Sequence, residues 1–346
     1  MTDGNSSLWA AVLADGRVVA FRVSAEGAEP ISIAPNQLSP SAPPMLVWDE
    51  EELRLFASTL ENASPLTHAI QVQEKTVFID RTGDLHVDDQ ILAVNAMPDA
   101  RLLHDELGRV LFLSGPTEVY DHGVLGDALE ATQISLVETL PEVHNLRTIE
   151  IPAGQVIEGI APIWADLNGD GQREIIVTLS NSTQGAQLAV FDEMGTLIGL
   201  SEPIGQGYRW RHQIAVAPFG PHGEIELVTV LTPHLGGVVE FFRLEENRLE
   251  ITARLGGFTS HVIGTRNLDM AIAGDFDGDG HLELLIPNQA RTELGALQRN
   301  GDGASVIWRL PLDGVLSSNL GSATSKDGKL WVGAGREDGV LRVWLP

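Results

Sequence analysis

The chain contains no cysteine among its 346 residues. Disulfide bonds, thiolate metal sites and a cysteine nucleophile are therefore excluded. Long apolar runs are also missing, since no window approaches the roughly 18 consecutive apolar residues of a membrane-spanning helix. The first seven residues have neither the basic start nor the apolar segment of a secretory signal peptide. We therefore expect no membrane insertion.

Basic residues are scarce. The chain has 22 lysines and arginines against 48 aspartates and glutamates, a formal net charge of −26. Such an excess of negative charge repels nucleic-acid phosphates and anionic lipids. We expect no nucleic-acid partner, and cations or basic partners are favoured instead.

Helical periodicity is nearly absent from the sequence. The 36 glycines and 18 prolines are spread along the chain rather than pooled. Short runs of β-branched and apolar residues alternate with turn residues throughout, which is typical of many short strands. The sequence therefore predicts an all-β protein.

A unit of strand, polar turn and strand recurs seven times, at intervals of about 50 residues. The pairs are Leu8–Leu13 with Arg17–Val23, Met45–Trp48 with Leu53–Ser58, Arg101–His104 with Arg109–Ser114, Ile163–Ala165 with Glu174–Leu179, His212–Ala217 with Glu224–Leu231, Met270–Gly274 with Leu282–Ile286, and Asn319–Thr324 with Leu330–Gly335. This interval is the length of a four-stranded propeller blade. We expect residues 1–7 to form a tail and residues 8–346 a single β-propeller, with seven four-stranded blades; six or eight also fit the pattern.

The last repeat runs out of chain after its third strand, and strand-like sequence begins near the N-terminus. In a closed ring, N-terminal residues can complete the last sheet and remove its open edge. We therefore expect the ring to close by strand pairing between the two ends of the chain.

Two of the predicted turns share a spacing of oxygen-bearing residues at positions 1, 3, 5 and 9, with glycine at position 6 and a backbone carbonyl available at position 7. This spacing suits a hard cation. The candidate ligands are Asp166, Asn168, Asp170, Gln172 and Glu174 in the first loop, and Asp275, Asp277, Asp279, His281 and Glu283 in the second. In both loops an apolar strand follows at once. Two matching copies argue against simple acidic turns, although turn formation alone is the alternative interpretation.

An EF-hand opens in the same way but needs a bidentate glutamate at position 12 and flanking helices. Position 12 is Val177 in one loop and Ile286 in the other, which excludes it. The long all-oxygen loop favours Ca²⁺ over Mg²⁺, and Zn²⁺ is disfavoured without nitrogen or sulfur ligands. We expect two Ca²⁺ sites, with the stronger at residues 275–283 because that loop brings four carboxylates.

A third hairpin, Ala217–Glu226, keeps the glycine and the late glutamate but has Ala, Phe and Pro in place of the leading acids. If Ala217 is aligned with Asp166 and Asp275, this segment falls in register between the two loops. It indicates a repeat in which the metal site has been lost.

Residues Ala165–Leu179 and Gly274–Ile286 resemble the calcium loops of FG-GAP and VCBS repeat propellers, the group that includes the integrin alpha-subunit head. The Phe-Gly and Gly-Ala-Pro signatures of the integrin repeats are not evident, so the bacterial VCBS type is the closer likeness. The resemblance implies a propeller with structural Ca²⁺ in the hairpin loops of one face. It also implies a ligand at the opposite face.

Several residues whose side chains commonly bind ligands fall in turns that we expect at that opposite face. The candidates are Arg209, Trp210, Arg211, His212, His234, His261 and Arg266. Arginine, histidine and aromatic side chains around a propeller mouth can bind a carboxylate, a sulfate or a sugar. The alternative interpretation is that the arginines pair with neighbouring acids and the tryptophan packs between blades.

No Gly-x-Ser-x-Gly elbow, His-Glu-x-x-His motif or phosphate-binding glycine loop occurs in the sequence. We expect a non-enzymatic, monomeric calcium-binding module for ligand binding or adhesion, located at the cell surface, outside the cell or in the periplasm. Its partner would be a protein or a carbohydrate. The alternatives are a polysaccharide lyase or glycosidase using His212 and His261 at the propeller mouth, and a structural spacer of a larger surface protein.

Overall fold

Strands are the regular elements of this fold. A computed structural model describes residues 2–3, 6–38, 45–49, 52–56, 62–207, 209–325 and 328–345, and it contains thirty strands and no helix in these residues. No helix able to cross a membrane is therefore found in the described ranges. The all-β prediction is confirmed.

The strands form successive sheets along the chain. The first three sheets are β1 (Thr2–Asp3), β2 (Ser6–Val12), β3 (Val18–Ser24) and β4 (Gly27–Ile31); β5 (Met45–Asp49) and β6 (Glu52–Phe56); and β7 (Ile70–Val72), β8 (Lys75–Ile79), β9 (Asp84–Val87) and β10 (Gln90–Ala93). The next two are β11 (Leu103–His104), β12 (Arg109–Thr117), β13 (Glu130–Glu138) and β14 (His144–Glu150); and β16 (Ile163–Ala165), β17 (Glu174–Ser180), β18 (Gln187–Phe191) and β19 (Leu197–Leu200), with β15 (Val156–Ile157) bridging β13 and β17. The last three are β20 (Arg211–Ala217), β21 (Glu226–Leu231), β22 (Val238–Glu245) and β23 (Arg248–Gly256); β24 (Ile272–Gly274), β25 (Glu283–Pro287), β26 (Glu293–Asn300) and β27 (Gly303–Pro311); and β28 (Leu316–Thr324), β29 (Leu330–Arg336) and β30 (Leu341–Trp344).

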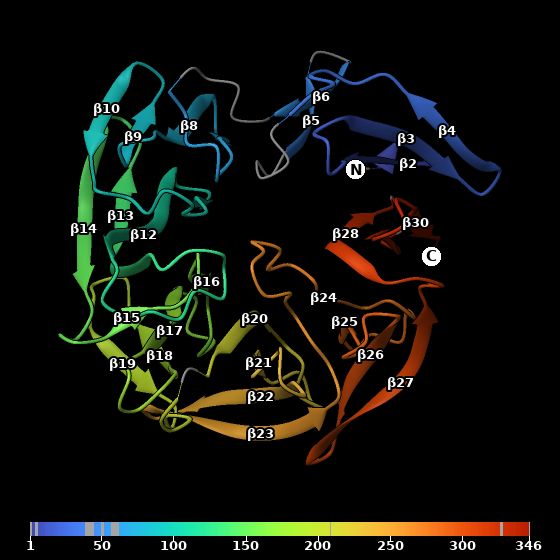
Figure 1. The fold of residues 1–346 in the computed structure, drawn as a ribbon. Coiled ribbons are helices and arrows are strands. Elements are labelled where there is room, and N and C mark those ends of the chain that lie inside the picture. The colour runs from blue at the N-terminus through green and yellow to red at the C-terminus, as the bar shows by residue number, and fades with distance from the viewer. Residues whose placement is uncertain are drawn as a thin grey trace.

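The sheets are arranged as the blades of a propeller. They follow one another around a ring, with strands such as β16, β20, β24 and β28 on the inside and β10, β14, β19, β23 and β27 on the outside (Figure 1). In the described chain, four sheets have three or four strands, and a 13-stranded sheet contains three more four-stranded groups that are joined through β15 and a single β19–β23 pair. These seven groups are consistent with seven blades. Counting the two-stranded sheet β5–β6 as well gives eight units, the upper number that the sequence allows.

All seven predicted hairpins form, from β2–β3 to β28–β29. The sheet β7–β10 is missing from the sequence prediction. Its strands have only three to five residues. Runs this short carry little periodicity, which explains why the hairpin at Ile70–Ile79 went unrecognised.

Many hairpins use one five-residue turn with glycine in its fourth position. In the turn between β11 and β12, the Asp105 amide donates to the Arg109 carbonyl and the Gly108 amide donates to the Asp105 carbonyl. Gly108 has φ +83°, a conformation that glycine adopts without the steric cost of a Cβ. The same two backbone bonds close the turns at Asp80–Asp84 and Asp192–Thr196. This local chemistry explains why the hairpins could be predicted.

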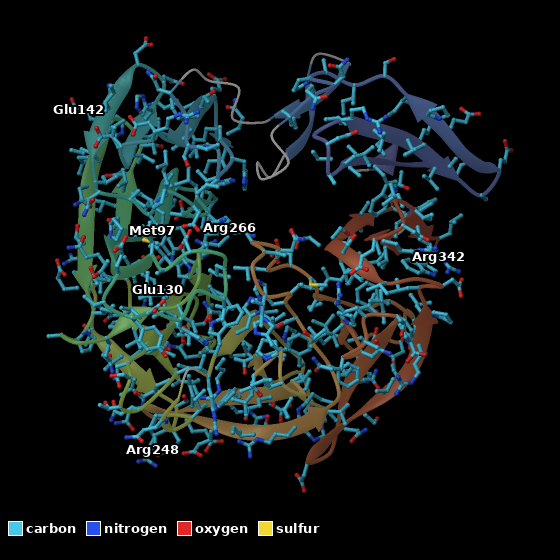
Figure 2. The ribbon with its side chains drawn as sticks, viewed as in Figure 1. Met97, Glu130, Glu142, Arg248, Arg266 and Arg342 are labelled. Atoms are coloured by element: carbon cyan, nitrogen blue, oxygen red, sulfur yellow. The ribbon has the colours of Figure 1, made fainter. Side chains whose placement is uncertain are left out.

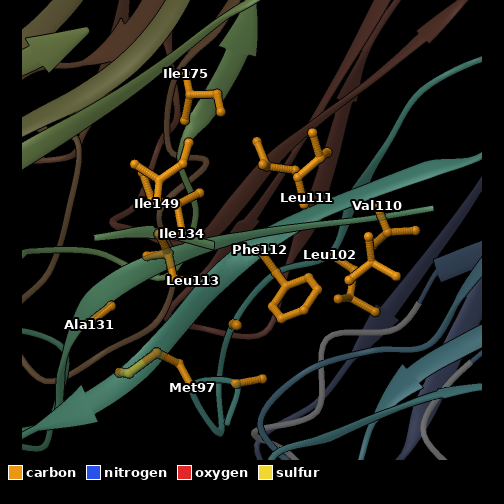
Figure 3. Close-up of a cluster of buried hydrophobic side chains, with 14 of the residues drawn as sticks. Met97, Leu102, Val110, Leu111, Phe112, Leu113, Ala131, Ile134, Ile149 and Ile175 are labelled. Atoms are coloured by element: carbon orange, nitrogen blue, oxygen red, sulfur yellow. The ribbon is translucent and has the colours of Figure 1, made fainter. Parts of the chain in front are cut away.

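The largest hydrophobic cluster lies between the blades that begin at β7, β11 and β16. Phe112, Leu111 and Leu113 on β12 are fully buried in it, and Ile134 and Ile175 reach it from neighbouring strands (Figure 3). Every residue of β17 is buried, because both faces of this strand are covered by adjacent sheets. Packing of this kind holds each blade against the next.

Within the residues that the structure describes, the ring closes by packing rather than by shared strands. The N-terminal residues form their own sheet, β1–β4, and the C-terminal residues form the separate sheet β28–β30 (Figure 1). Trp9 of β2 is buried between them with Trp331 and Ala323, and a Cβ at Gly333 would collide with its indole ring. The predicted strand pairing between the chain ends is therefore wrong. The expected tail at residues 1–7 is also corrected, because Thr2–Asp3 forms β1 and Ser6–Ser7 begins β2.

Candidate functional site

The two acidic loops connect the first and second strands of their blades and have the same internal hydrogen bonds. Both carboxylate oxygens of the first aspartate are used: Asp166 accepts from Gly169 N at 2.6 Å and Gly171 N at 2.9 Å, and Asp275 accepts from Gly278 N and Gly280 N at 2.7 and 3.0 Å. Amides of the following residues bind the side chains at positions 3 and 5 in both loops. The shared spacing therefore produces one shared conformation.

The second loop gathers three carboxylates. Oxygens of Asp275, Asp277 and Glu283 lie within 4.8 Å of one another, a donor set that suits a hard divalent cation. Glu283 is fully buried at the start of β25 and accepts a hydrogen bond from Phe276 N at 2.8 Å. Burial, together with Asp277 and Asp279, raises the pKa of Glu283 to about 7. A cation in this loop would favour the ionised carboxylate.

The first loop differs at its third position. The Asn168 side-chain oxygen accepts from Asp170 N, as Asp277 does from Asp279 N, so the second atom of Asn168 is an amide nitrogen. That nitrogen donates to Glu174 at 3.0 Å and to Asp170 at 3.2 Å. In the second loop the Gln298 amide nitrogen makes the two equivalent bonds, to Asp279 at 3.1 Å and to Glu283 at 3.2 Å. The loops therefore differ in having Asn168 where the second loop has the carboxylate of Asp277.

The side chains of Gln172 and His281 are exposed, as expected if these residues contribute only through their backbone carbonyls. Both backbone amides donate to the carboxylate two residues earlier, at 2.8 Å. These bonds turn the chain at position 7.

The third hairpin also begins its second strand with a buried glutamate, Glu226. Ala217 pairs with Glu226, as Ala165 pairs with Glu174 and Gly274 with Glu283. Pro218 rather than Ala217 therefore stands at position 1, a one-residue correction of the sequence alignment. Glu226 is bound by two guanidinium groups, since Arg299 Nε donates to it at 2.8 Å and Arg243 Nη2 at 3.0 Å.

The predicted ligand residues cluster at the other end of the same strands. On β20 and β21, Arg211 pairs with Leu231 at one end, and Ala217 pairs with Glu226 at the hairpin end. Residues just before β20 and after β21 therefore lie opposite the hairpin turn. Trp210 and His234 occupy these positions, so the predicted separation of the two faces is observed.

Four of the predicted residues form one aromatic cluster. The Trp210 ring stacks on His212 with centroids 4.5 Å apart and meets His261 edge-on at 5.2 Å. His234 contacts both, with centroids 6.2 Å from Trp210 and 5.0 Å from His261. Trp210, His212 and His261 are only 2%, 4% and 2% exposed, so all three lie behind the surface. Trp210 packs in a buried cluster with Val124, Leu125 and Ile160, as the alternative interpretation of a packed tryptophan expects.

Hydrogen bonds fix the protonation of two of these histidines. His261 Nε2 lies 2.8 Å from the Thr265 carbonyl, so it carries the proton and donates it. Burial lowers the pKa of His261, and burial and His261 lower that of His234 to about 4, so both are neutral near pH 7. His261 Nδ1 therefore accepts from His234 Nε2 at 2.8 Å. Because the proton of neutral His234 is on Nε2, its Nδ1 is left as an acceptor.

A cavity of about 390 Å³ opens beside this cluster, with Arg209, Trp210 and His234 in its wall. His122 lines the same cavity from the loop between β12 and β13, and its Nδ1 lies 2.5 Å from Glu158. Glu158 is fully buried and also accepts from Ser180 Oγ. The sequence gives no local indication of this contact, because Glu158 is 36 positions from His122.

The three predicted arginines have different surroundings. Arg209 is exposed at the cavity wall. Arg211 points to the other side of the sheet, where its Nε donates to buried Glu240 at 2.9 Å. Arg266 donates to Asp99 at 2.8 Å and also to Asp127, and it lies on the inner side of the ring (Figure 2). Arg211 and Arg266 thus follow the alternative interpretation of pairing with acids.

Near Arg266 lies a buried acidic group that the sequence analysis missed. Burial raises the pKa of Glu130 to about 9, and the nearby Glu158 carboxylate adds to the effect. Glu130 is 3% exposed, and its Oε2 has no hydrogen-bond partner in the described residues. Burial also raises the pKa of Asp99 despite the Arg266 contact. A neutral Glu130 thus stands beside a carboxylate that is bound to His122.

No protein-family model and no curated protein sequence matches the chain. A Bacteroides fragilis NCTC 9343 protein, provisionally described as a 6-phosphogluconolactonase, is 13% identical over 99% of this chain and 90% of its own, with a TM-score of 0.50. A Bacteroides uniformis ATCC 8492 protein with the same description is 16% identical over 95% and 88%, with a TM-score of 0.48. The exotype rhamnogalacturonan lyase YesX is 13% identical over 99% and 65%, with a TM-score of 0.45. At these identities the first likeness establishes the fold alone, a β-propeller.

Proposed function

We propose that the protein is a calcium-stabilised β-propeller of the FG-GAP/VCBS type that binds a ligand at the face opposite its metal loops. The observation that carries the metal assignment is the set of three carboxylates, Asp275, Asp277 and Glu283, with oxygens within 4.8 Å. The site at residues 166–174 is the weaker one. Loops of modest affinity suit the abundant free Ca²⁺ outside cells, which supports a location outside the cytoplasm.

Thermal unfolding with Ca²⁺, Mg²⁺ and chelator tests the metal assignment. A ligand that binds only the folded state stabilises it by about 2.7 kcal/mol at a hundredfold excess over its Kd. We expect a rise in Tm that is specific to Ca²⁺ and largely lost in Asp275→Ala. Asp302→Ala, in the exposed turn between β26 and β27, is the matched control and should keep the rise. An equal rise with Mg²⁺, or an undiminished rise in Asp275→Ala, would reject the assignment.

The cavity beside Trp210 is the proposed ligand site, and a carbohydrate or a protein segment is the proposed ligand. Its wall combines an exposed arginine and a histidine with an acceptor nitrogen, backed by the buried indole ring of Trp210, a combination that suits a polar ligand. Screening immobilised glycans and protein partners tests it. Binding should weaken in Arg209→Ala and His234→Ala but not in Arg309→Ala, whose side chain is 50% exposed on β27. A structural spacer would bind nothing in this screen.

Acid–base catalysis at the same cavity is a second candidate function. It is favoured by two oriented histidines in one cavity wall, His122 held by Glu158 and His234 held by His261. In a lyase or a glycosidase, one such group removes a proton and the other donates one to the leaving oxygen. These two histidines replace His212 and His261 as the candidate catalytic residues, because the latter are buried behind the cavity.

Incubation with acidic polysaccharides tests this second function. A lyase would produce an unsaturated product with new ultraviolet absorbance, and a glycosidase would produce reducing ends without it. His122→Gln and His234→Gln should each abolish turnover, whereas His144→Gln, which changes an exposed histidine on β14, should not. Binding without turnover would leave the ligand-binding function alone.

A further inference from the structure

A second cavity, of about 460 Å³, lies against the inner strands β7, β11 and β16 and the segments beside them. Its polar wall consists of two arginines, Arg101 and Arg173, and two histidines, His68 and His104. Trp164 and apolar side chains form the rest. No aspartate or glutamate lines this cavity in the described part of the chain. The cavity is distinct from the one beside Trp210.

The composition of this wall contrasts with that of the chain. Acidic residues outnumber lysines and arginines by 48 to 22, so most surface concavities of the protein should contain carboxylates. A wall with two arginines and no acid presents guanidinium donors to an anion, although acids behind the wall pair with both arginines and the net charge is −26. The contrast therefore points to an anionic ligand rather than to general surface charge.

The two arginines are held in place by acids outside the lining. Arg101 Nη1 donates to Asp269 at 2.8 Å, and this is its one side-chain hydrogen bond within the described residues. Its other N–H groups remain available, and its side chain is 26% exposed. Arg173 donates to Glu106 from both Nη2, at 2.6 Å, and Nη1, at 3.4 Å, and its Nη1 lies 3.7 Å from Asp105. Anchoring of this kind fixes a guanidinium without using all five of its donors.

Trp164 forms a rigid part of the wall. Its Nε1 donates to Glu193 at 2.9 Å, which fixes the indole. The guanidinium of Arg173 lies over this ring, 5.4 Å from its centroid, and Arg109 lies 5.1 Å from it. Cation–π contact of this kind holds Arg173 against the cavity before any ligand arrives. Such preorganisation lowers the entropy cost of binding.

His68 adds a neutral polar group. Burial, and then the nearby Arg101, lower its pKa, so the ring is uncharged near pH 7. A neutral imidazole offers one donor and one acceptor, which suits a hydroxyl group of a ligand. The cavity therefore combines cationic groups with a polar group able to bind an alcohol.

We propose that this cavity binds a small hydroxylated molecule with a carboxylate or phosphate group, through charge-assisted hydrogen bonds from Arg101 and Arg173. The volume is in the range of small-molecule sites, about 300 to 1,000 Å³. This second site does not depend on the calcium loops or on the cavity beside Trp210.

Calorimetric titration with four probes at physiological salt tests the proposal: D-glucuronate, glucose 6-phosphate, inorganic phosphate and glucose. Binding of glucuronate alone assigns a carboxylate ligand, and binding of glucose 6-phosphate alone or with inorganic phosphate assigns a phosphate ligand; either supports the site. Inorganic phosphate bound more tightly than both sugar anions would overturn the requirement for a hydroxylated ligand. Glucose bound as tightly as the anions, or no anion bound at millimolar concentration, would overturn the proposal.

Three variants locate the binding. Arg101→Met and Arg173→Met should each weaken the anion by roughly tenfold or more, the effect of losing one charge-assisted hydrogen bond. Arg248→Met removes the same charge from the outer strand β23, where the side chain is 67% exposed (Figure 2), and should leave affinity unchanged. An equal loss of anion affinity in Arg248→Met would show that the effect comes from the overall charge of the protein, and would refute the proposed site.

A measurement on the unaltered chain covers the case in which an arginine variant fails to fold. NMR titration of the His68 ring should show its pKa rising when the anion binds, because a negative charge nearby favours the imidazolium. The exposed His144 ring should show no such shift and serves as the internal control. A His68 pKa unchanged at saturating anion would contradict binding at this cavity.

Discussion

Replacing Glu130 by glutamine should change how the stability of the protein depends on pH. The carboxyl group is 3% exposed beside Glu158, and burial raises its pKa from the usual 4.5 to about 9. At pH 7 the folded chain therefore holds this proton, whereas the unfolded chain has released it. The folded state must take up a proton in order to form, which lowers its stability.

The sign and the size follow from linkage. Because the folded pKa is raised, the stabilising contribution is complete below pH 4.5 and is lost as pH rises through 9. The loss is about 1.4 kcal/mol per pH unit in that window, or about 3 kcal/mol by pH 7. Glutamine has the shape of the protonated acid and does not titrate. The free energy of unfolding of Glu130→Gln, relative to that of wild type, should therefore grow by about 1.4 kcal/mol for each unit by which pH rises.

Urea unfolding of both chains at pH 5, 6, 7 and 8 measures this difference. Since Glu130 is neutral in the folded state over this range, its replacement leaves the charge near Glu158 unchanged, and other titrating groups cancel between the two chains. Glu142→Gln, at an exposed glutamate at the periphery of the ring (Figure 2), is the control and should run parallel to wild type. If the stabilities of Glu130→Gln and wild type changed with pH in the same way, the inference that Glu130 is buried in its neutral form would be refuted.

Three further predictions follow from packing and charge. Arg299→Met should destabilise the protein by about 3 to 5 kcal/mol in chemical unfolding, because it removes one guanidinium from buried Glu226. The control Arg309→Met, at a half-exposed side chain, should cost less than about 1 kcal/mol. Trp9→Ala should cost about 3 to 5 kcal/mol and open the ring at the β2–β29 contact, visible as faster amide exchange in β29 but not in β17. Asn168→Asp should tighten Ca²⁺ binding at residues 166–174 in calorimetric titration, because it adds a carboxylate and removes the amide donor to Glu174; unchanged affinity would contradict the role assigned to Asn168.

The parts of the fold that the sequence predicts are those controlled by short-range chemistry. Hairpin turns are closed by residues within five positions of one another, as in Asp105–Arg109, and strand ends follow from them. The shared conformation of the two acidic loops is predictable for the same reason, because nine consecutive residues form it. The sheet β7–β10 was missed because its strands are too short to show a period.

The cavities depend on contacts between distant segments, which spacing in the sequence does not encode. His122 and Glu158 are 36 positions apart and come from different blades. Arg101 meets Asp269 from 168 positions away. One signal was nevertheless available: side chains alternate along a strand, so Trp210 and His212 share a face and Arg211 lies on the other. Applied to residues 209–212, this rule separates Arg211 from the histidine cluster.

Three blades begin their second strand with a buried glutamate, and each glutamate requires positive charge or a donor nearby. Glu226 is bound by two arginines. Glu174 accepts a hydrogen bond from the Asn168 amide, and Glu283 accepts one from the Gln298 amide at 3.2 Å. Two aspartates of its own loop also lie close to Glu283. Burial raises the pKa of both Glu174 and Glu283, the two glutamates without an arginine. A divalent cation would do for Glu283 what Arg243 and Arg299 do for Glu226. A cation at Glu283 and the two arginines at Glu226 would thus be two solutions to one electrostatic requirement.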